Sequence, residues 1–208
     1  MHVTSDLSSS ALPSKTACPF HTFEMWLAEA KISEINDPEA MALATCDENS
    51  CPDVRMVLLK GHDSRGFVFY SHQDSTKGVE LRAHAQAALL FHWKSLRRQI
   101  RVRGPVVPVS EEEADTYFAS RSRESQLGAW ASQQSQHLEK RSRLEENYTY
   151  YSHLFEGNQV PRPPYWVGFR VVPLSIEFWL DRPFRLHERM LFTRSSEKET
   201  WACECLYP

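Results

Sequence analysis

The residues that could do chemistry in this 208-residue sequence are mostly cations and hydroxyls. The densest group is Arg185-Leu186-His187-Glu188-Arg189, and on a β-strand Arg185, His187 and Arg189 would share one face at intervals of about 6.6 Å. Three positive or titratable groups in a row repel one another unless they face an anion, and a phosphate dianion is the simplest such partner. The alternative is an exposed basic edge strand that resists aggregation.

A second cationic segment is Arg55-Met56-Val57-Leu58-Leu59-Lys60, in which two charges bracket an apolar strand. Such a segment could also be a plain strand with solvated ends. An ideal strand sends Arg55 and Lys60 to opposite faces, because they differ by an odd number of positions. If both residues serve one site, a bulge or a strand end must bring them together.

Two further segments are rich in hydrogen-bonding groups. Residues 117–130 (YFASRSRESQLGAW) place hydroxyl and guanidinium groups at an expected helix end and in the loop after it. An ordinary polar helix exit, with arginine favouring the C-terminal end of the helix dipole, would have the same composition. Gln133-Gln134-Ser135 supplies amide and hydroxyl groups that could bind a polar ring or chain, although such runs are often simple loops. The sequence has no GxGxxG, Walker, HExxH or GxSxG motif.

The first element expected along the chain is a helix. Its evidence is the recurrence of Phe23, Trp26, Leu27 and Ala30 at helical spacing. Two-residue alternation or β-rich composition then predicts an antiparallel meander of three strands at 40–46, 52–60 and 67–71. Further strands are expected at 87–93, 99–107, 166–171, 174–179, 185–193 and 201–206, and further helices at 75–84, after Ser110 and at 138–155. The predicted fold is mainly β with surrounding helices (α+β), a small barrel of about seven or eight mostly antiparallel strands.

Ser110-Glu111-Glu112-Glu113 predicts a capping box, in which the Ser110 hydroxyl and the Glu113 carboxylate each satisfy an amide at the start of a helix. Residues 1–18 are polar and Ser-rich, without the pattern of a secretory or transit peptide, and we expect a disordered arm before a single domain at 19–208.

Composition narrows the classes of partner and location. The net charge of -3 gives no long-range attraction to nucleic acid or an anionic membrane, and no apolar run approaches the ~18 residues that span a bilayer. Five cysteines without a CxxC pair argue against a disulfide framework and a structural zinc site. We therefore expect a reducing compartment, most simply the cytoplasm, and no bound metal.

Taken together and in their order along the chain, the four segments resemble the pyridoxamine/pyridoxine 5′-phosphate oxidase family. The resemblance runs from Phe23 to Pro208. The most specific pieces are RMVLLK at 55–60, FVFYS at 67–71, residues 117–130, and IEFW followed by RLHER within 176–189. The resemblance implies an FMN-binding split β-barrel that works as a homodimer, with two flavin sites at the subunit interface built from both chains. It also implies hydride transfer from C4′ of pyridoxamine or pyridoxine phosphate to flavin N5, with dioxygen reduced to hydrogen peroxide.

Position by position, the resemblance implies which residues contact each molecule. The residues expected to contact FMN are Arg55, Met56, Val57, Leu58, Leu59, Lys60, Tyr70, Ser71, Thr76, Lys77, Gln99, Gln134, Ser135, Trp179 and Arg189. The residues expected to hold the substrate are Lys60, Tyr117, Arg121, Ser125, Arg185, Leu186 and His187. We expect Arg185 and His187 to be catalytic, orienting the substrate over the flavin while one of them accepts the C4′ hydroxyl or amine proton.

Several positions depart from the family's usual pattern. Thr76 stands where the family normally has arginine before Lys77, Leu180-Asp181 replaces Gln-Gly, Gln136 replaces serine, and Cys205 replaces a closing arginine. Two other functions remain open. One is another split-barrel flavoprotein, such as a flavin reductase or a haem-degrading relative, which the RLHER and YFxSR motifs argue against. The other is a non-catalytic protein that stores or delivers pyridoxal phosphate.

Overall fold

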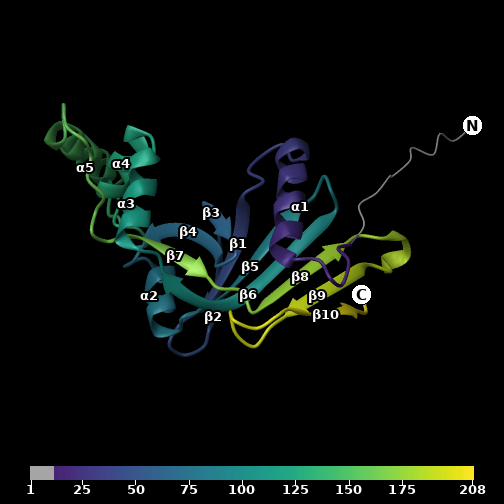
Figure 1. The fold of residues 1–208 in the computed structure, drawn as a ribbon. Helices are drawn as coiled ribbons and strands as arrows, with labels where there is room; N and C mark the ends of the chain where they lie inside the picture. The colour runs from purple at the N-terminus through teal and green to yellow at the C-terminus, as the bar shows by residue number, and fades with distance from the viewer. Residues whose placement is uncertain (1–11) are drawn as a thin grey trace, which may run out of the picture.

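The computed structural model describes residues 12–208, in which ten strands and five α-helices form a curled antiparallel sheet with helices around it (Figure 1). The strands are β1 (Ala40–Cys46), β2 (Pro52–Leu58), β3 (Gly61–Asp63), β4 (Gly66–His72), β5 (Gln86–Trp93), β6 (Arg98–Pro108), β7 (Trp166–Val171), β8 (Ser175–Leu180), β9 (Glu188–Thr193) and β10 (Ala202–Leu206). The helices are α1 (Pro19–Ser33), α2 (Thr76–Ala83), α3 (Glu111–Ser120), α4 (Arg123–Ala131) and α5 (Arg141–Leu154).

The long strand β6 belongs to two groups of strands. Its first half pairs with β8 in the order β10-β9-β8-β6-β5-β1-β2, and its second half pairs with β7, which continues through β4 to β3. Gly104 lies at the crossing, where an added Cβ would stand 1.9 Å from the Val172 carbonyl oxygen. Only glycine fits this close approach of two backbones.

The curl closes where β2 gives way to β3. The Leu59 amide still donates to the Glu39 carbonyl at 2.9 Å, whereas the Lys60 amide donates to Val68 of β4 at 2.8 Å. The chain therefore passes from one group of strands to the other within two residues. This passage and the shared strand β6 make the split barrel that the family resemblance implied.

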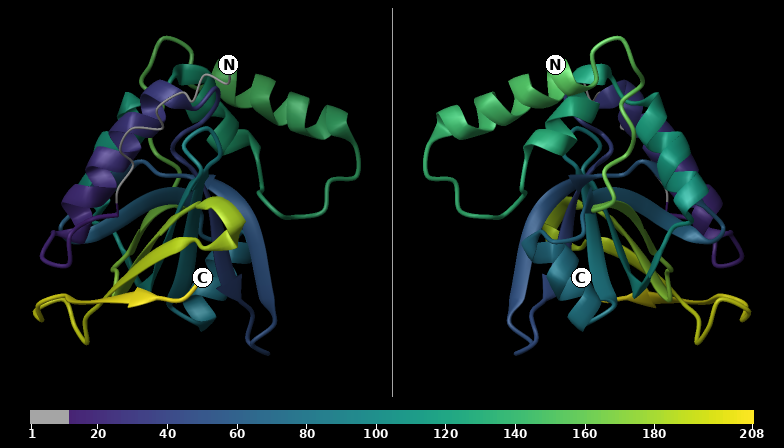
Figure 2. Two further views of the ribbon diagram at one scale, coloured as in Figure 1. Left: turned by 90° about the vertical axis from the view of Figure 1, so that its right-hand side faces the viewer. Right: turned by 90° about the vertical axis from the view of Figure 1, so that its left-hand side faces the viewer.

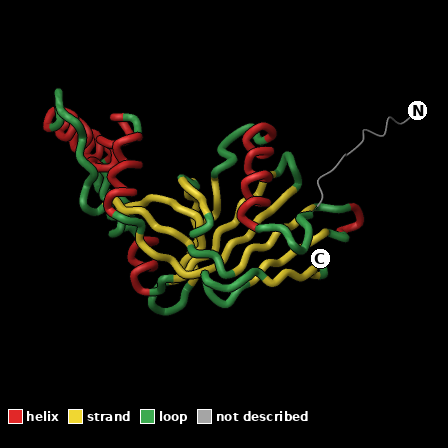
Figure 3. The backbone as a smooth tube through the Cα atoms, viewed as in Figure 1, coloured by secondary structure: helices red, strands yellow, loops and turns green. Residues whose placement is uncertain are grey.

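The main core lies between α1 and the inner face of the strands. In Figure 3, α1 is the upright red helix above the yellow strands near the centre of the view. The predicted stripe of α1 is confirmed, because Phe23, Trp26, Leu27 and Ala30 are all buried. The Phe23 ring meets that of Phe91 edge to face at 5.0 Å. Such aromatic contacts hold the helix on the sheet.

A second, smaller core forms where α3, α4 and α5 gather beside β4 and β7, at the end of the molecule away from β8–β10 (Figures 1 and 2). Phe118, Leu127, Val160 and Trp166 are its buried members. The predicted polar segment 117–130 lies at this end of the fold, on α3 and α4.

Two predictions about local structure are wrong. The strand expected at 185–193 begins only at Glu188, because Pro183–Arg185 is a 3-10 turn in which Phe184 and Arg185 have φ of 60° and 62°. A proline has no N–H for a strand ladder, and the left-handed residues after it turn the chain away. Arg185, His187 and Arg189 therefore do not form one strand face. Residues 123–131 form helix α4 instead of the expected loop, with the Ser122 hydroxyl accepting from the Ser125 amide at its start.

The capping box is confirmed in one half. The Ser110 hydroxyl accepts from the Glu113 amide at 3.1 Å. The Glu113 carboxylate instead receives two hydrogen bonds from the buried Arg170, at 2.8 and 2.9 Å. Both come from Arg170 Nη2, and such charge-assisted bonds are stronger than a bond to an amide that water can reach.

The expected arm at residues 1–18 lies largely outside the described residues. Of the part that is described, Leu12 packs against the main core, and the Ala17 amide donates to the Ser14 carbonyl at 3.0 Å. All five cysteines are free thiols. Within residues 12–208, no helix is both long enough and apolar enough to cross a membrane.

Candidate functional site

Three predicted residues, Ser71, Lys77 and Gln134, meet where β4, α2 and the segment after α4 come together, and with Arg55 of β2, whose charge acts on Lys77, we call them the Lys77 cluster. Lys77 Nζ donates to Gln134 Oε1 at 3.2 Å and to Ser75 Oγ at 3.4 Å, and Ser71 Oγ donates to the same Gln134 oxygen at 3.1 Å. Lys77 is only 7% exposed, and its burial together with the nearby Arg55 charge lowers its pKa. A buried ammonium held by neutral oxygens is well suited to receive an anion.

Arg55 is held beside this cluster by the buried Glu80 of α2. Its Nη2 lies 3.0 Å from Glu80 Oε2 and 2.5 Å from Asp53 Oδ2, and its Nη1 donates to the Thr45 hydroxyl. Because the carboxylates and the hydroxyl fix the guanidinium from several sides, Arg55 is an ordered cation rather than a mobile surface charge. Thr76, the residue before Lys77, is exposed.

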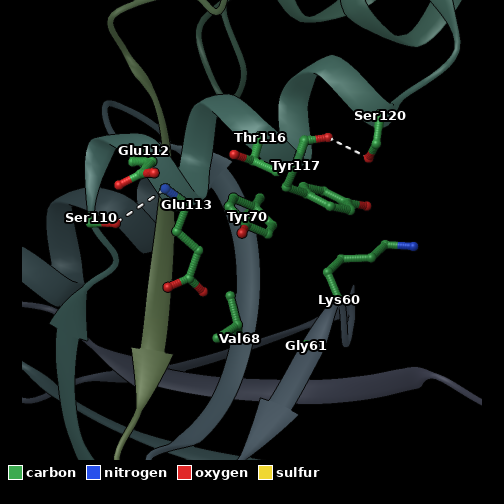
Figure 4. Close-up of a pocket in the computed structure, with 10 residues that line it drawn as sticks. All are labelled: Lys60, Gly61, Val68, Tyr70, Ser110, Glu112, Glu113, Thr116, Tyr117 and Ser120. Atoms are coloured by element: carbon green, nitrogen blue, oxygen red, sulfur yellow. Dashed lines mark hydrogen bonds between the residues drawn. The ribbon is translucent and has the colours of Figure 1, made fainter.

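Lys60, Tyr70 and Tyr117 line a cavity of about 520 Å³ between β4 and α3, which we call the Tyr117 cavity (Figure 4). The rings of Tyr70 and Tyr117 stack at 4.3 Å, and Tyr70 stacks on Trp166 at 4.8 Å. In Figure 4 the Lys60 amine and the Tyr117 hydroxyl extend toward the same side of the cavity. Burial raises the pKa of Tyr70 to about 12, so this phenol stays neutral at physiological pH. The volume and the aromatic lining suit a small ring compound.

Arg121 adds a cation next to these stacked rings, between α3 and α4. Its guanidinium carbon lies 5.1 Å from the centroid of the Trp166 ring and 5.5 Å from that of Phe118. Its Nη1 is buried and has no hydrogen-bond partner within residues 12–208, and burial lowers the pKa of the group. A buried donor left unpaired costs about 1–3 kcal/mol, so an anionic ligand that reached it would bind favourably.

Gln99, Trp179 and Arg189 form one cross-strand row on β6, β8 and β9, which we call the Trp179 row. The register pairs Gln99 with Trp179 and Trp179 with Arg189. Alternation along β8 places Trp179 on the face opposite Phe178, which packs on α1. Arg189 Nε donates to the buried Glu177 at 2.7 Å, and this bond raises the pKa of Arg189. The row therefore lies on the outer face of the sheet.

Of the predicted catalytic residues, Arg185 lies in the turn next to this row and His187 lies just after it. The His187 ring lies 4.6 Å from that of Trp179, and its Nδ1 lies 2.9 Å from Asp181 Oδ1. Arg185 and Leu186 are exposed, the latter at 67%. The turn thus projects Arg185 outward from the edge of the Trp179 row.

Within one chain the predicted residues do not share a single pocket. The Lys77 cluster and the Tyr117 cavity lie on either side of β4, where Tyr70 and Ser71 are consecutive residues. The Trp179 row lies elsewhere: β9, which carries Arg189, is five strand spacings from β2, which carries Arg55, or ~24 Å along the sheet. The resemblance implied that each site is built from two chains, so this separation within one chain does not test that prediction.

The remaining predicted residues occupy the surroundings of these groups. Leu59 is buried and Val57 half-buried, whereas Met56 and Leu58 are exposed on the outer face of β2, at 64% and 42%. The residues with polar side chains outside the three groups are exposed: Thr76, Ser125 and Ser135. The Ser125 hydroxyl lies 3.0 Å from that of Ser122, and Ser125 is not among the described residues that line the Tyr117 cavity.

Sequence reasoning missed seven of the ten described residues that line the Tyr117 cavity. Glu113, Thr116 and Ser120 line it from α3. Glu113 and Ser120 lie at i−4 and i+3 from Tyr117 and so share its side of the helix. A helical wheel centred on Tyr117 would have found them. Sequence reasoning also missed Glu177, the buried partner of Arg189 in the Trp179 row. No sequence signal would have found it, because an acidic residue in an alternating strand normally points to solvent.

A split barrel of antiparallel strands with buried cations and stacked aromatic rings at its edge defines a class of proteins that bind flavin nucleotides. The family model described as "Pyridoxamine 5'-phosphate oxidase" matches residues 28–154, and that described as "Pyridoxine 5'-phosphate oxidase C-terminal dimerisation region" matches residues 166–208. The chain therefore belongs to the pyridoxamine 5′-phosphate oxidase family of enzymes, and a flavin is the cofactor that this membership implies.

Curated relatives agree with this assignment over most of the chain. A pyridoxine/pyridoxamine 5'-phosphate oxidase from Bartonella quintana is 61% identical over 191 residues, which cover 91% of this chain and 92% of that protein. A protein of the same name from Nitrobacter winogradskyi is 60% identical over 190 residues, covering 91% of this chain and 89% of its own.

Solved structures have the same fold. PhzG from Burkholderia lata 383, in complex with tetrahydrophenazine-1-carboxylic acid, superposes with a TM-score of 0.88 at 32% identity, over 97% of this chain and all of that chain. An FMN-binding protein related to pyridoxamine 5'-phosphate oxidase, from Nostoc punctiforme, has a TM-score of 0.74 at 16% identity over 93% of this chain and 100% of its own.

The described residues fit a flavin nucleotide. Lys77 and Arg55 place two ordered cations side by side, and Lys77 is buried among neutral oxygens, as the phosphate of a nucleotide requires. Gln99 and Trp179 place an amide next to an indole ring on the outer face. These donor types match the phosphate end and the ring end of a flavin, respectively.

Proposed function

We propose that this chain oxidises pyridoxamine 5′-phosphate and pyridoxine 5′-phosphate to pyridoxal 5′-phosphate, with FMN as cofactor and dioxygen reduced to hydrogen peroxide. From the amine, water hydrolyses the resulting imine to the aldehyde and ammonia. One observation carries the proposal. The chain has two separate cationic groups: the buried Lys77 with the half-buried Arg55, and the half-buried Arg121 on the Trp166 ring with the exposed Lys60 of the Tyr117 cavity. Two such groups are what an enzyme needs to hold a phosphorylated cofactor and a phosphorylated substrate at once.

On the cofactor side, Lys77 and Arg55 hold the FMN phosphate, and Ser71 and Gln134 hydrogen-bond to the same end of the molecule. The Trp179 row, with Gln99 and Arg189, contacts the flavin ring system. When bound, the flavin accepts a hydride from the substrate and passes the electrons to dioxygen. The protein's own contribution is to place the ring edge next to the substrate and to exclude water from that contact.

On the substrate side, Arg121, Lys60 and the Tyr117 hydroxyl hold the phosphate, with Ser125 completing the set. Arg185 and His187 lie over the pyridine ring and fix C4′ at the flavin. One of these two residues takes the proton that the C4′ hydroxyl or amine gives up. Loss of this proton offsets the positive charge that develops at C4′ as the hydride leaves.

We further propose that the working enzyme is a homodimer with FMN at the interface. Trp179 and Arg189 lie four and five strand spacings, ~19 and ~24 Å, from the strand of Arg55 within one sheet, and this separation is bridged if each site takes the row from one subunit and the Lys77 cluster from the other. The outer face of β2 suits such pairing, because Val54, Met56 and Leu58 expose apolar side chains there. The match of residues 166–208 to a dimerisation region supports the same arrangement. Since all five cysteines are free, we place the enzyme in the cytoplasm.

A peroxide-release assay with each phosphorylated vitamer, with and without added FMN, tests the oxidase. Peroxide formed in a one-to-one ratio with pyridoxal phosphate is the expected result, and sedimentation of the same sample should show a dimer. Purified protein without a flavin absorption band that still binds pyridoxal phosphate would indicate the carrier function instead. Oxidation of an unphosphorylated ring compound, such as a reduced phenazine carboxylate, in preference to the vitamers would exclude the substrate assignment.

A further inference from the structure

Asp181 closes the base of the turn that carries Arg185. Its carboxylate Oδ1 lies 2.9 Å from His187 Nδ1, so it joins the end of β8 to the residue just before β9. Asp181 also pairs with Arg97 in the turn before β6, and its own amide donates to the Arg97 carbonyl at 3.1 Å. At 15% side-chain exposure, the carboxylate is a fixed group rather than a mobile one.

A second contact competes for the same ring nitrogen. The Arg182 amide nitrogen lies 3.2 Å from His187 Nδ1 and would donate to it if that atom carried a lone pair. Nδ1 can carry a hydrogen for Asp181 or a lone pair for Arg182, but not both at once. The contact with the carboxylate is shorter and charge-assisted, and it therefore prevails.

We infer that Asp181 is a positioning residue that keeps a hydrogen on Nδ1 of His187, so that Nε2 is the ring atom left to exchange a proton or a hydrogen bond with the bound ligand. A carboxylate that orients a functional histidine in this way fixes both its tautomer and its ring plane. The consequence for turnover rests on the proposed function, whereas the tautomer itself does not.

The test uses the full-length holoenzyme labelled with ¹⁵N-histidine, in which the His187 ring signals are assigned by their loss in His187→Gln. Asp181→Ala leaves the Arg182 amide beside Nδ1, so the hydrogen should move to Nε2. Asp181→Asn should do the same while preserving the size of the side chain, because Arg97 attracts the amide oxygen and turns the amide NH₂ toward Nδ1. Both variants should lower kcat on the order of 10–100-fold, with a smaller change in KM.

Glu188→Ala is the matched control. It removes the Arg182–Glu188 pair across the same turn, in which Arg182 Nε donates at 2.7 Å and Nη2 at 3.2 Å, without altering the carboxylate at Nδ1. The control should keep the Nδ1–H signal and lose much less activity. An unchanged His187 tautomer in both Asp181 variants, or a changed tautomer with full turnover, would overturn the inference. A tautomer change in a protein whose wild type oxidises neither vitamer would reject the proposed oxidase and leave the Asp181 assignment standing.

Discussion

Lys77 Nζ lies 3.2 Å from Oε1 of Gln134, although 57 positions separate the two residues in the chain. The contact joins α2 to the segment after α4 and leaves the ammonium among neutral oxygens. Lys77→Met should weaken FMN binding by about 1.5–3 kcal/mol, the usual value of a hydrogen bond to a charged group. Titration of the apoprotein against flavin fluorescence measures this change. The exposed Lys94 in the turn before β6 gives a control, since Lys94→Met should leave the affinity as it was.

The lowered pKa of Lys77 predicts how FMN binding depends on pH. The ordinary value is 10.5, and burial and Arg55 lower it in the apoprotein, so the ammonium is lost on the alkaline side at a pH below 10.5. FMN affinity should fall across that window, because the phosphate binds the charged form. The stability of the apoprotein should change in the opposite sense, since the unfolded chain holds more protons there and this group adds stability as pH rises. Flavin titrations and thermal melts from neutral to alkaline pH, with Lys77→Met lacking both effects, provide the measurement.

Arg121→Ala should weaken substrate binding by about 2–5 kcal/mol, because it removes a half-buried guanidinium from a phosphate site. FMN affinity should stay the same, since Arg121 is not part of the Lys77 cluster. The control is Arg123→Ala, two residues further on, whose side chain donates to the carbonyls of Asn158 and Phe155 instead. Comparable losses in the two variants, measured by KM and by direct vitamer binding, would assign the effect to helix geometry rather than to the phosphate.

Arg185→Ala should lower kcat/KM for both phosphorylated vitamers on the order of 100-fold, with FMN still bound. Arg185 is exposed in a turn and makes no contribution to the core, so the folded protein should persist. Steady-state kinetics with each vitamer measure the loss, and Lys198→Ala, in the turn between β9 and β10, supplies the control. Full activity of Arg185→Ala on both vitamers would contradict the proposed role of this arginine.

Gly104→Ala should prevent or strongly destabilise folding, because its Cβ would lie 1.9 Å from a backbone oxygen that cannot move aside. Gly128→Ala, in α4, meets nothing within 4 Å and should stabilise that helix by about 0.5–1 kcal/mol. Thermal melts of the two variants should therefore move in opposite directions. A Gly104→Ala protein that melts like the wild type would show that the crossing of β6 and β7 is less tight than described.

Much of the fold could be predicted from the sequence because its signals are local. The stripe of α1 follows helical spacing, and β1 and β7 have the predicted bounds, since alternating apolar residues specify which face is buried. The sequence predicted one strand at 52–60, whereas β2 ends at Leu58 and the Lys60 amide already donates to Val68 of β4. Parity required such a break only if Arg55 and Lys60 served one site. The turn at 183–185 was not, because the alternating pattern of RLHER fits a strand equally well, and the left-handed Phe184 and Arg185 have no signature in residue type.

The candidate site was predicted in its membership more than in its arrangement. Lys77 and Gln134 were assigned to the same ligand through the resemblance, and the structure places them in contact. The separation of the Trp179 row from Arg55 depends on strand order, which composition and spacing do not determine. The contact between Asp181 and His187 depends on how a turn folds back, which a linear pattern does not report.

The position of β6 in both groups of strands limits how this molecule can move. A hinge between the two groups would have to break the main-chain bonds on either side of Gly104, where Leu174 donates to Arg103 and Val172 donates to Pro105 at 2.9 and 2.8 Å. The two groups of strands should therefore behave as one rigid body. Any opening that admits a ligand must come from the segments that connect the strands at the edge of the barrel.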